Sequence, residues 1–462
     1  MKYLTRRYGG LLSSLLAVTL LTACNPASQT TDRGPAPTVH VNITIVATAA
    51  GLSSPTGTPA STPAPTATGL PPAASVPGQC PAVRLDAPAP QKPQSFADIT
   101  GALVAYLNAG AGPHDVERLL ISWGAIATLP NPIGLAGGVV TGTMLTGSDP
   151  QVVAAYIDNS QPQTPSHRGD VLVLTCGEGR YSVIYQASSD RSLSGPIMNP
   201  RILAVRDVTG AGPADLTFSM TDCGVDTCYS GIAILSAING ALHNVIPGFA
   251  WIPAPVFDFS TNGVDKSLSL NVHPGFLSSP GAGPQRAVTE TWQYEDGVYT
   301  RTLVTRAPPV YRIHALQDGD AAFRSNDLST AKAIYQRVIN DPTLQAYQGN
   351  APLRDEAQIL GAFARFRLME IAAISGDDAG VQAAYAGLAP AAGGKSPTAL
   401  YVELADAFMG AYQQARNYAV ACDAAVRYAQ EHKNVFLILG QDTFGAANLD
   451  YQADDMCIVP GK

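Results

Sequence analysis

The 462-residue sequence lacks the motifs that identify several common enzyme classes. It has no Gly-x-Ser-x-Gly segment, which presents the nucleophile of many serine hydrolases, and no His-Glu-x-x-His segment, which supplies two zinc ligands and a general base. None of its seven histidines stands at zinc-ligand spacing from a cysteine. We therefore expect no catalytic residues. The sequence favours a protein that is not an enzyme, without excluding an enzyme.

Positive charge is also scarce. Charged side chains make up 14% of the residues, and the formal net charge is −8. After Lys2, Arg6 and Arg7 the chain contains no cluster of basic residues. A protein that binds the phosphate backbone of a nucleic acid needs such a cluster. We therefore expect no nucleic-acid partner.

The apolar stretch Gly10–Leu21 is too short to remain in a bilayer as a spanning helix. It follows the basic N-terminal residues and ends in Leu21-Thr22-Ala23-Cys24. This ending resembles the lipobox of bacterial lipoproteins, which implies that residues 1–23 are a signal peptide and that Cys24 is lipidated. The resemblance places the mature protein outside the cytoplasm, lipid-anchored to a bacterial membrane at the cell surface. An ordinary signal peptide with a chance cysteine is the alternative.

Residues 24–94 are rich in Pro, Thr, Ser and Ala. From Asn25 to Gln94 they hold 14 of the chain's 36 prolines and only five charged side chains. Such a segment buries too little apolar surface to offset the entropy of ordering it, so we expect a disordered tether. Within it, residues 39–45 alternate like a strand. They are either a sticky part of the tether or a strand of the folded region.

The cysteines agree with a compartment outside the cytoplasm. Apart from Cys24 their number is even, which favours disulfides, although six cysteines allow 15 connectivities. The short spacing of two of them favours a small loop between strands, and a second bridge would pin the C-terminus. The expected pairs are Cys223 with Cys228, Cys422 with Cys457, and Cys80 with Cys176.

Residues 95–306 contain three units of one plan, each with four short strands and two glycine-containing turns. Asn-Gly and Asp-Gly pairs supply the positive φ angles of tight hairpins. The glycines of the first turns are Gly147, Gly210 and Gly263, and those of the second turns are Gly179, Gly240 and Gly297. The expected strands are 139–145, 151–156, 170–174 and 180–185, then 202–207, 215–218, 231–235 and 241–246, and finally 255–259, 267–272, 289–294 and 298–304.

The segment from Asp207 to Leu216, sequence DVTGAGPADL, resembles the FG-GAP or VCBS repeat of integrin-α-like propellers. The resemblance implies calcium ligands at Asp207 and Asp215. Further ligands are expected at Thr209 and Ala211, and alanine offers no side-chain oxygen to calcium. The alternative is a structural turn in which Asp207 binds backbone amides and the glycines adopt positive φ. Calcium is the only cofactor that the sequence suggests.

Two helices are predicted before the first unit, at 96–108 and 114–126. We expect them to cover an exposed sheet edge. Three units are too few for an ordinary closed propeller, which has four or more blades. A partial propeller and a stack of sheets closed by helices both remain open.

Residues 307–462 change to a helical pattern that resembles the tetratricopeptide repeat. Ala322-Phe323 fits the first helix, Asn326-Asp327 the turn, and Ala331 and Tyr335 the second helix. A looser copy spans 363–388 with a turn at Gly376-Asp377, and 399–413 and 417–432 form a third pair. A plain helical bundle is the alternative.

The sequence thus predicts an α+β protein. A β-repeat domain of three four-stranded, partially propeller-like units precedes an all-α, tetratricopeptide-like domain. Repeats of both kinds build extended binding surfaces. We therefore expect a membrane-anchored scaffold that binds a protein, peptide or glycan partner. An envelope hydrolase, or its accessory subunit, acting on glycan or peptide is the second hypothesis.

Overall fold

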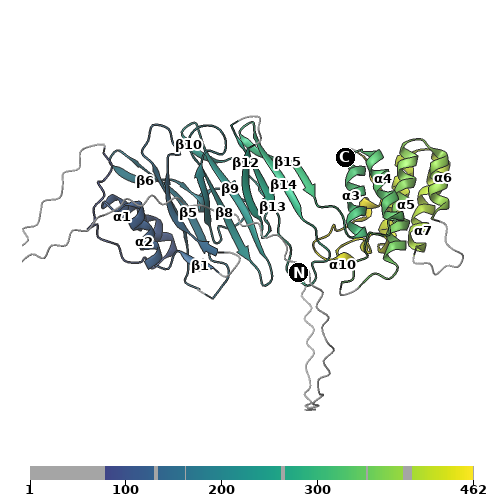
Figure 1. Cartoon of the computed structure of the whole chain (residues 1–462), viewed down its shortest axis with the longest axis horizontal. Helices are drawn as coiled ribbons and strands as arrows, with labels where there is room; N and C mark the ends of the chain where they lie inside the picture. Colours follow the sequence, from purple (N-terminus) through teal and green to yellow (C-terminus); the bar gives the residue numbers. More distant parts are fainter. Residues whose placement is uncertain are drawn as a thin grey trace, which may run out of the picture. The chain divides into compact units, whose positions relative to one another are not determined.

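Figure 1 shows the computed structural model of the chain. It describes residues 79–129, 134–161, 163–261, 266–349, 352–388 and 398–460. The chain divides into two units, Met1–Pro71 and Pro72–Lys462, and all described residues belong to the second. The predicted signal peptide, Cys24 and the strand-like stretch at 39–45 lie outside the described residues. Among the described helices, none has both the length and the apolar character needed to cross a bilayer.

Three antiparallel sheets follow one another along the chain, each a meander of four consecutive strands (Figure 1). Sheet 1 contains β3 (Gly138–Gly142), β4 (Gln151–Ile157), β5 (Gly169–Gly177) and β6 (Arg180–Gln186). Sheet 2 contains β7 (Arg201–Arg206), β8 (Asp215–Cys223), β9 (Cys228–Ile238) and β10 (Ala241–Asn244), and the short β11 (Ile252–Pro253) also pairs with β9. Sheet 3 contains β12 (Val256–Thr261), β13 (Leu268–His273), β14 (Val288–Glu295) and β15 (Val298–Arg306). The predicted division into three four-stranded units is confirmed.

The closing hairpins of the three sheets share one type of turn. Two residues separate the paired strand ends at Glu178-Gly179, Asn239-Gly240 and Asp296-Gly297. The first residue of each pair has φ between 51° and 53°, and the glycine has φ between 79° and 87°. Two successive positive φ angles define the type I′ turn, which matches the twist of a hairpin. The predicted second turns are therefore confirmed, whereas Gly263 lies outside the described residues.

The sheets stack face to face, with a separate apolar core between successive layers. Along β4, Val152, Ala154 and Tyr156 pack in the core shared with the N-terminal helices, whereas Val153 and Ala155 pack against sheet 2. All seven residues of β4 are buried. A strand covered on both faces needs a continuous apolar sequence, which is why β4 does not alternate as an edge strand would.

Helices α1 (Ile99–Asn108) and α2 (Pro113–Ser122) cover the outer face of sheet 1. They cover mainly a sheet face rather than the predicted edge, but α1 also reaches the edge strand β6, where Asn108 Nδ2 donates to Tyr181 O at 3.1 Å and Tyr181 N donates to Asn108 Oδ1 at 2.7 Å. The apolar residues of β4 that point away from sheet 2 need this partner, and an edge would offer only backbone groups. The 3₁₀ turn η1 (Phe96–Asp98) precedes α1, and a small hairpin of β1 (Ala127–Leu129) and β2 (Gly134–Ala136) follows α2.

The folded region begins before the expected boundary at residue 94. The backbone N–H of Arg84 donates to Gly110 O at 2.8 Å, and Lys92 Nζ donates to Trp123 O at 2.7 Å. Ala87 packs against the core under α1 and α2. Residues 79–94 thus lie on the helical cap, although their composition is that of a tether.

The outer face of sheet 3 is mostly polar, although Val256 and Leu303 are also exposed on it. The positions that alternate with the buried ones hold Asp258 on β12, Asn271 and His273 on β13, and Thr289 and Thr291 on β14. A fourth sheet stacked on this face would bury these groups at a cost. The stack therefore begins with an apolar face under helices and ends with a mostly hydrophilic face.

The C-terminal region consists of three antiparallel helix pairs and a C-terminal segment. The pairs are α3 (Arg312–Arg324) with α4 (Leu328–Asn340), α5 (Glu356–Ile374) with α6 (Asp378–Ala386), and α7 (Ala399–Ala415) with α8 (Tyr418–Glu431). The C-terminal segment, 434–458, contains α9 (Asn434–Leu437), α10 (Gln441–Phe444) and the 3₁₀ turn η3 (Ala453–Met456). One more 3₁₀ turn, η2 (Ala187–Ser189), follows sheet 1.

The turn inside each helix pair repeats one local structure. A residue with positive φ comes first, namely Asn326 at 63°, Gly376 at 68° and Arg416 at 49°. The next residue, Asp327, Asp377 or Asn417, caps the following helix by accepting a backbone N–H three residues ahead. Such caps satisfy N–H groups that have no partner within the helix. The α+β fold, with β sheets first and helices last, is confirmed.

Candidate functional site

The loop predicted to bind calcium is a tightly bonded turn. Asp207 accepts hydrogen bonds from the N–H groups of Gly210 and Gly212, at 2.7 and 2.9 Å. Asp215 Oδ2 accepts three, from Val208 N, Thr209 N and Thr209 Oγ1, at 2.8–3.0 Å. Gly210 and Gly212 have φ of 77° and 102°. A calcium ion would have to compete with these donors for the same oxygens, so calcium binding stays a prediction.

The corresponding loop of sheet 1 has the same structure with a neutral residue. Gln151 is the first residue of β4, as Asp215 is of β8, and both are almost fully buried. Gln151 Oε1 accepts from Met144 N at 2.7 Å and from Leu145 N at 3.1 Å. Gln151 and Asp215 therefore share one role: a side-chain oxygen at the start of the strand accepts hydrogen bonds from backbone N–H groups of the preceding loop. No local signal in the sequence predicts this role of Gln151; only the alignment of the repeats points to it.

The three expected disulfides are present. They join Cys80 to Cys176, Cys223 to Cys228 and Cys422 to Cys457. The first ties the N-terminal residues to β5, the second joins facing residues of β8 and β9, and the third ties the C-terminal segment to α8. Among the described residues, one group of side chains could hold a metal ion by type and distance, namely Glu370, Cys422 and Cys457. The two sulfur atoms of this group are bonded to each other.

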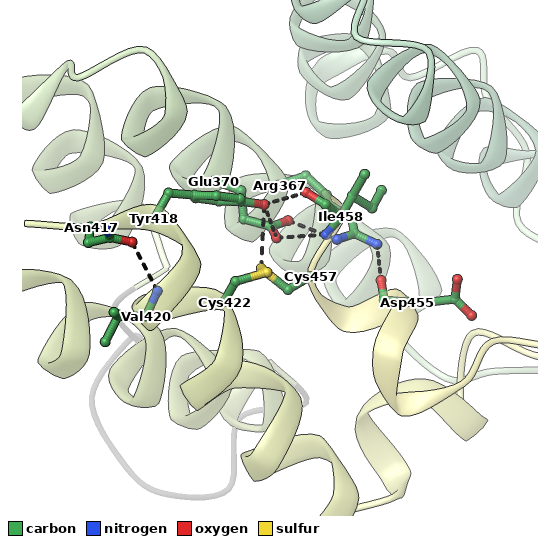
Figure 2. The surroundings of a disulfide bond; sticks show 9 residues. All are labelled: Arg367, Glu370, Asn417, Tyr418, Val420, Cys422, Asp455, Cys457 and Ile458. Carbon is green, nitrogen blue, oxygen red and sulfur yellow. Dashed lines mark hydrogen bonds and ion pairs between the residues drawn. A yellow bond between two sulfur atoms is a disulfide. The ribbon is translucent and has the colours of Figure 1, made fainter. Parts of the chain in front are cut away.

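A buried ionic cluster lies beside the third disulfide (Figure 2). Arg367 of α5 contacts Asp320 of α3 (Nε to Oδ1, 3.1 Å) and Glu370 (Nη1 to Oε2, 2.8 Å), and all three side chains are inaccessible to solvent. Asp320 also accepts from the hydroxyls of Tyr335 and Tyr451, at 2.6 and 2.8 Å. One guanidinium thus faces two carboxylates inside the protein.

Burial, and to a smaller extent the second carboxylate, shift the pKa values in this cluster. Burial raises the pKa of Glu370 to about 7 and nearby Asp320 adds to the rise, while Arg367 opposes it. Burial works against the charge of Arg367, but Asp320 and Glu370 outweigh it and hold its pKa above the ordinary value. Glu370 is therefore the group that takes up a proton near neutral pH.

The C-terminal segment covers the first helices of all three pairs. Tyr451 donates to Asp320 of α3, and Ile458 N donates to Glu370 of α5 at 3.3 Å. Tyr401 of α7 donates to Val435 O at 3.0 Å. Arg367 Nη2 donates to Asp455 O at 2.5 Å, which Figure 2 also shows. The C-terminal segment therefore fills the surface formed by α3, α5 and α7. In a helical repeat protein, such a surface can hold a bound peptide.

A groove between α4, α5 and α6 remains open. Its volume is about 530 Å³. Its floor includes Ile339, Leu368 and Ile371, and its rim carries Lys332 and Arg365.

Another pocket lies where the β sheets meet the helices, and we call it the junction pocket. Its volume is about 630 Å³. The 274–286 loop after β13 forms one wall, α3 and residues 446–449 form the opposite wall, and Tyr229, Val288 and Arg306 complete the lining from the strands.

The walls of the junction pocket are tied together by specific contacts. Arg286 and Asp318 form two hydrogen bonds, at 2.7 and 2.5 Å, and the arginine side chain is 11% exposed. Backbone bonds run from Ala446 N to Gly281 O and from Ala447 N to Ala282 O, at 3.0 and 2.9 Å. Partly buried charge-assisted pairs of this geometry are stronger than exposed ones. The pocket is therefore a preformed feature of the fold.

A row of three polar side chains on sheet 3 has the composition of a hydrolase triad. His273 Nε2 lies 2.8 Å from Asp258 Oδ2, and its Nδ1 lies 3.1 Å from Thr289 Oγ1. The row lies on the open sheet face, and none of its members lines a pocket described above. Its members lie within paired strands, and no pair of unpaired backbone N–H groups is seen beside them among the described residues. This geometry does not support the hydrolase hypothesis.

Comparison of the whole chain with models of known families, with curated proteins and with solved structures finds no match.

Proposed function

We propose that the protein is a lipid-anchored, extracytoplasmic binding module whose ligand site is the junction pocket. The ligand is a protein, peptide or glycan component of its surroundings. In this proposal Cys24 carries the lipid, the residues that follow it act as a tether, and the β sheets and helices together present the pocket away from the membrane.

The junction pocket is the observation that carries this proposal. Ligand sites of about 300–1,000 Å³ occur preferentially where two structural regions meet, and the junction pocket has this size and position. Its wall residues are held by the Arg286–Asp318 pair before any ligand arrives. A preorganised site loses less entropy on binding than one that must form.

The repeats supply the scaffold in this proposal. The sheets are degenerate FG-GAP-like units in which Gln151 and Asp215 hold loops instead of an ion. The helix pairs are tetratricopeptide-like, and Gly319 illustrates their packing because a Cβ at this position would lie 2.6 Å from the Tyr335 ring. Since the C-terminal segment fills the surface of α3, α5 and α7, the binding role falls to the junction.

Two experiments test the proposal separately. For the anchor, the Cys24→Ser chain is expected in the soluble extracytoplasmic fraction and the native chain in the membrane fraction. Equal membrane association of both chains would contradict lipid anchoring. For the site, the full-length lipidated chain in detergent is screened on peptide and glycan arrays beside the Phe276→Ala variant.

Phe276 is 55% exposed and lines the junction pocket, so its loss should weaken any ligand bound there. Leu303→Ala is the matched control, because Leu303 is 56% exposed on sheet 3 and does not line the pocket. A ligand that binds both variants as tightly as the native chain would place the site elsewhere.

A further inference from the structure

We propose that the junction pocket binds a sugar acid, meaning a saccharide ring that carries a carboxylate. This inference rests on the proposed function in one respect, since it takes the junction pocket as the ligand site. It follows from the polar groups that the pocket leaves without a partner.

Most polar side chains in the pocket are already used by the protein. Gln285 bonds to the backbone of Leu277 through both ends of its amide. Asn448 Nδ2 donates to Pro284 O at 3.1 Å and to Phe444 O at 2.7 Å. These groups build the wall and contribute little to a ligand. The remaining groups define the ligand chemistry.

Arg306 supplies the unbalanced charge. Three arginines and one aspartate line the pocket, in a chain whose net charge is −8. Arg286 is paired with Asp318, and Arg324 with Asp455 outside the pocket lining at 2.9 Å. Arg306, at the end of β15, is exposed and makes no ion pair with any described residue. A single free guanidinium matches one carboxylate, which it can bind through two parallel hydrogen bonds.

His314 supplies an acceptor that also lacks a partner. It is 3% exposed, and its Nε2 lies 3.2 Å from Pro284 O, which can only accept. Burial lowers the pKa of His314 and nearby Arg286 lowers it further, while Pro284 O, Asp318 and Asn448 oppose the shift. The ring is therefore neutral with its proton on Nε2, and Nδ1 is a buried acceptor without a hydrogen bond. A ligand hydroxyl can donate to Nδ1 once the side chains that cover this atom shift, whereas a simple carboxylate has no such donor.

The remaining wall is apolar and partly aromatic. Phe276 is 55% and Tyr229 is 40% exposed, and Leu449 is 46% exposed. The electron-rich face of an aromatic ring attracts positively polarised C–H groups. A sugar ring offers such C–H groups on its faces and hydroxyls around its edge. Carboxylate, hydroxyl and C–H face together match the three kinds of group that the pocket leaves open.

The wall is poorly suited to an extended peptide. A bound peptide strand needs main-chain donors and acceptors along its length. Pro253, Pro274 and Pro284 line the pocket, and proline has no N–H to donate. The observations therefore favour a sugar acid over a peptide with a free carboxylate.

The test measures binding of methyl glucuronide and methyl glucoside to the full-length lipidated chain by calorimetry and saturation-transfer NMR. The two probes share a ring and differ in one carboxylate. We expect the glucuronide to bind at least about tenfold more tightly, which corresponds to about 1.4 kcal/mol. Arg306→Gln should remove this preference and leave glucoside binding unchanged. Phe276→Ala should weaken both probes.

Arg180→Gln is the matched control, because Arg180 is an exposed strand-end arginine on sheet 1 without an ion pair among the described residues. Equal affinity for both probes would refute the carboxylate inference and leave the junction pocket as the ligand site. An acetylated tripeptide that binds in the pocket while both sugars fail would also refute the inference. If Phe276→Ala changes the binding of no probe, the site itself is wrong and the proposed function fails with it.

Discussion

Replacing Glu370 by glutamine tests whether the buried cluster carries a surplus negative charge. Burial raises the pKa of Glu370 from 4.5 to about 7 in the folded chain. Between these pH values the folded state binds more protons than the unfolded state, so the free energy of unfolding falls as the pH rises. Each pH unit contributes about 1.4 kcal/mol, so ionised Glu370 lowers the stability above pH 7 by about 3 kcal/mol.

Glutamine removes this cost because it is neutral at every pH. It loses the weak acceptor for Ile458 N, at 3.3 Å, which costs about 1 kcal/mol. Arg367 keeps Asp320 as its partner. We therefore expect Glu370→Gln to be about 2 kcal/mol more stable than the native chain at about pH 8 and about 1 kcal/mol less stable at about pH 4, below the pKa of Glu370 in the unfolded chain.

The assay is urea unfolding followed by far-ultraviolet circular dichroism at both pH values, with the disulfides intact. Glu431→Gln, on an exposed position at the end of α8, is the control and should change neither value. Burial also raises the pKa of Glu356 to about 7, but that contribution is present in both chains and cancels. A variant that is destabilised by about 3 kcal/mol or more at both pH values would refute the reasoning, since it would mean that ionised Glu370 is the required partner of Arg367.

Three further predictions concern the turns and the boundaries. Gly283→Ala should lower the melting temperature, because the new Cβ would clash with the backbone oxygen of Phe444 at a φ of 81°. Gly297→Ala, at a φ of 87° but in open space, should lower it less. Asp215→Ala should lower the free energy of unfolding by about 2–3 kcal/mol, since it leaves buried donors unpaired. Millimolar calcium should not raise the melting temperature of the native chain, and a clear rise would support the calcium site instead. Breaking the disulfide by replacing Cys80 and Cys176 with serine should lower the free energy of unfolding by about 2–5 kcal/mol, and unchanged urea unfolding would show that the N-terminal residues are not part of the fold.

The repeat plan was readable from local signals. Asn239-Gly240 and Asp296-Gly297 specify their turns because few residues other than glycine accept φ near 80°. Asp327 and Asp377 likewise specify helix starts, since their side chains accept the first free backbone N–H groups. These predictions needed no knowledge of distant contacts. Arg416 carries no such signal, because arginine has no preference for positive φ; the sequence predicted a break between helices here, but the positive φ of Arg416 became visible only in the structure.

The candidate site was not readable in the same way. The junction pocket brings together Tyr229, Phe276, Arg306 and His314, which lie on four separate segments of the chain. No spacing in the sequence predicts that these four share a wall. The same holds for the cluster of Asp320 with Arg367, whose partners come from three different parts of the helical region.

The sequence by itself determined the α+β order, the three four-stranded units and the hairpin turns, because each depends on residues close together in the chain. It indicated the disulfide pairs less directly, from the short spacing of Cys223 and Cys228, the position of Cys457 in the tail and the two cysteines left over. Tertiary structure alone decided that α1 and α2 cover a face, that residues 79–94 belong to the fold, and that the C-terminal segment fills the surface of α3, α5 and α7. The physical reason is that packing depends on which apolar faces remain uncovered once the elements have formed. A segment such as 79–94 becomes ordered through its partners, and its own composition does not reveal them.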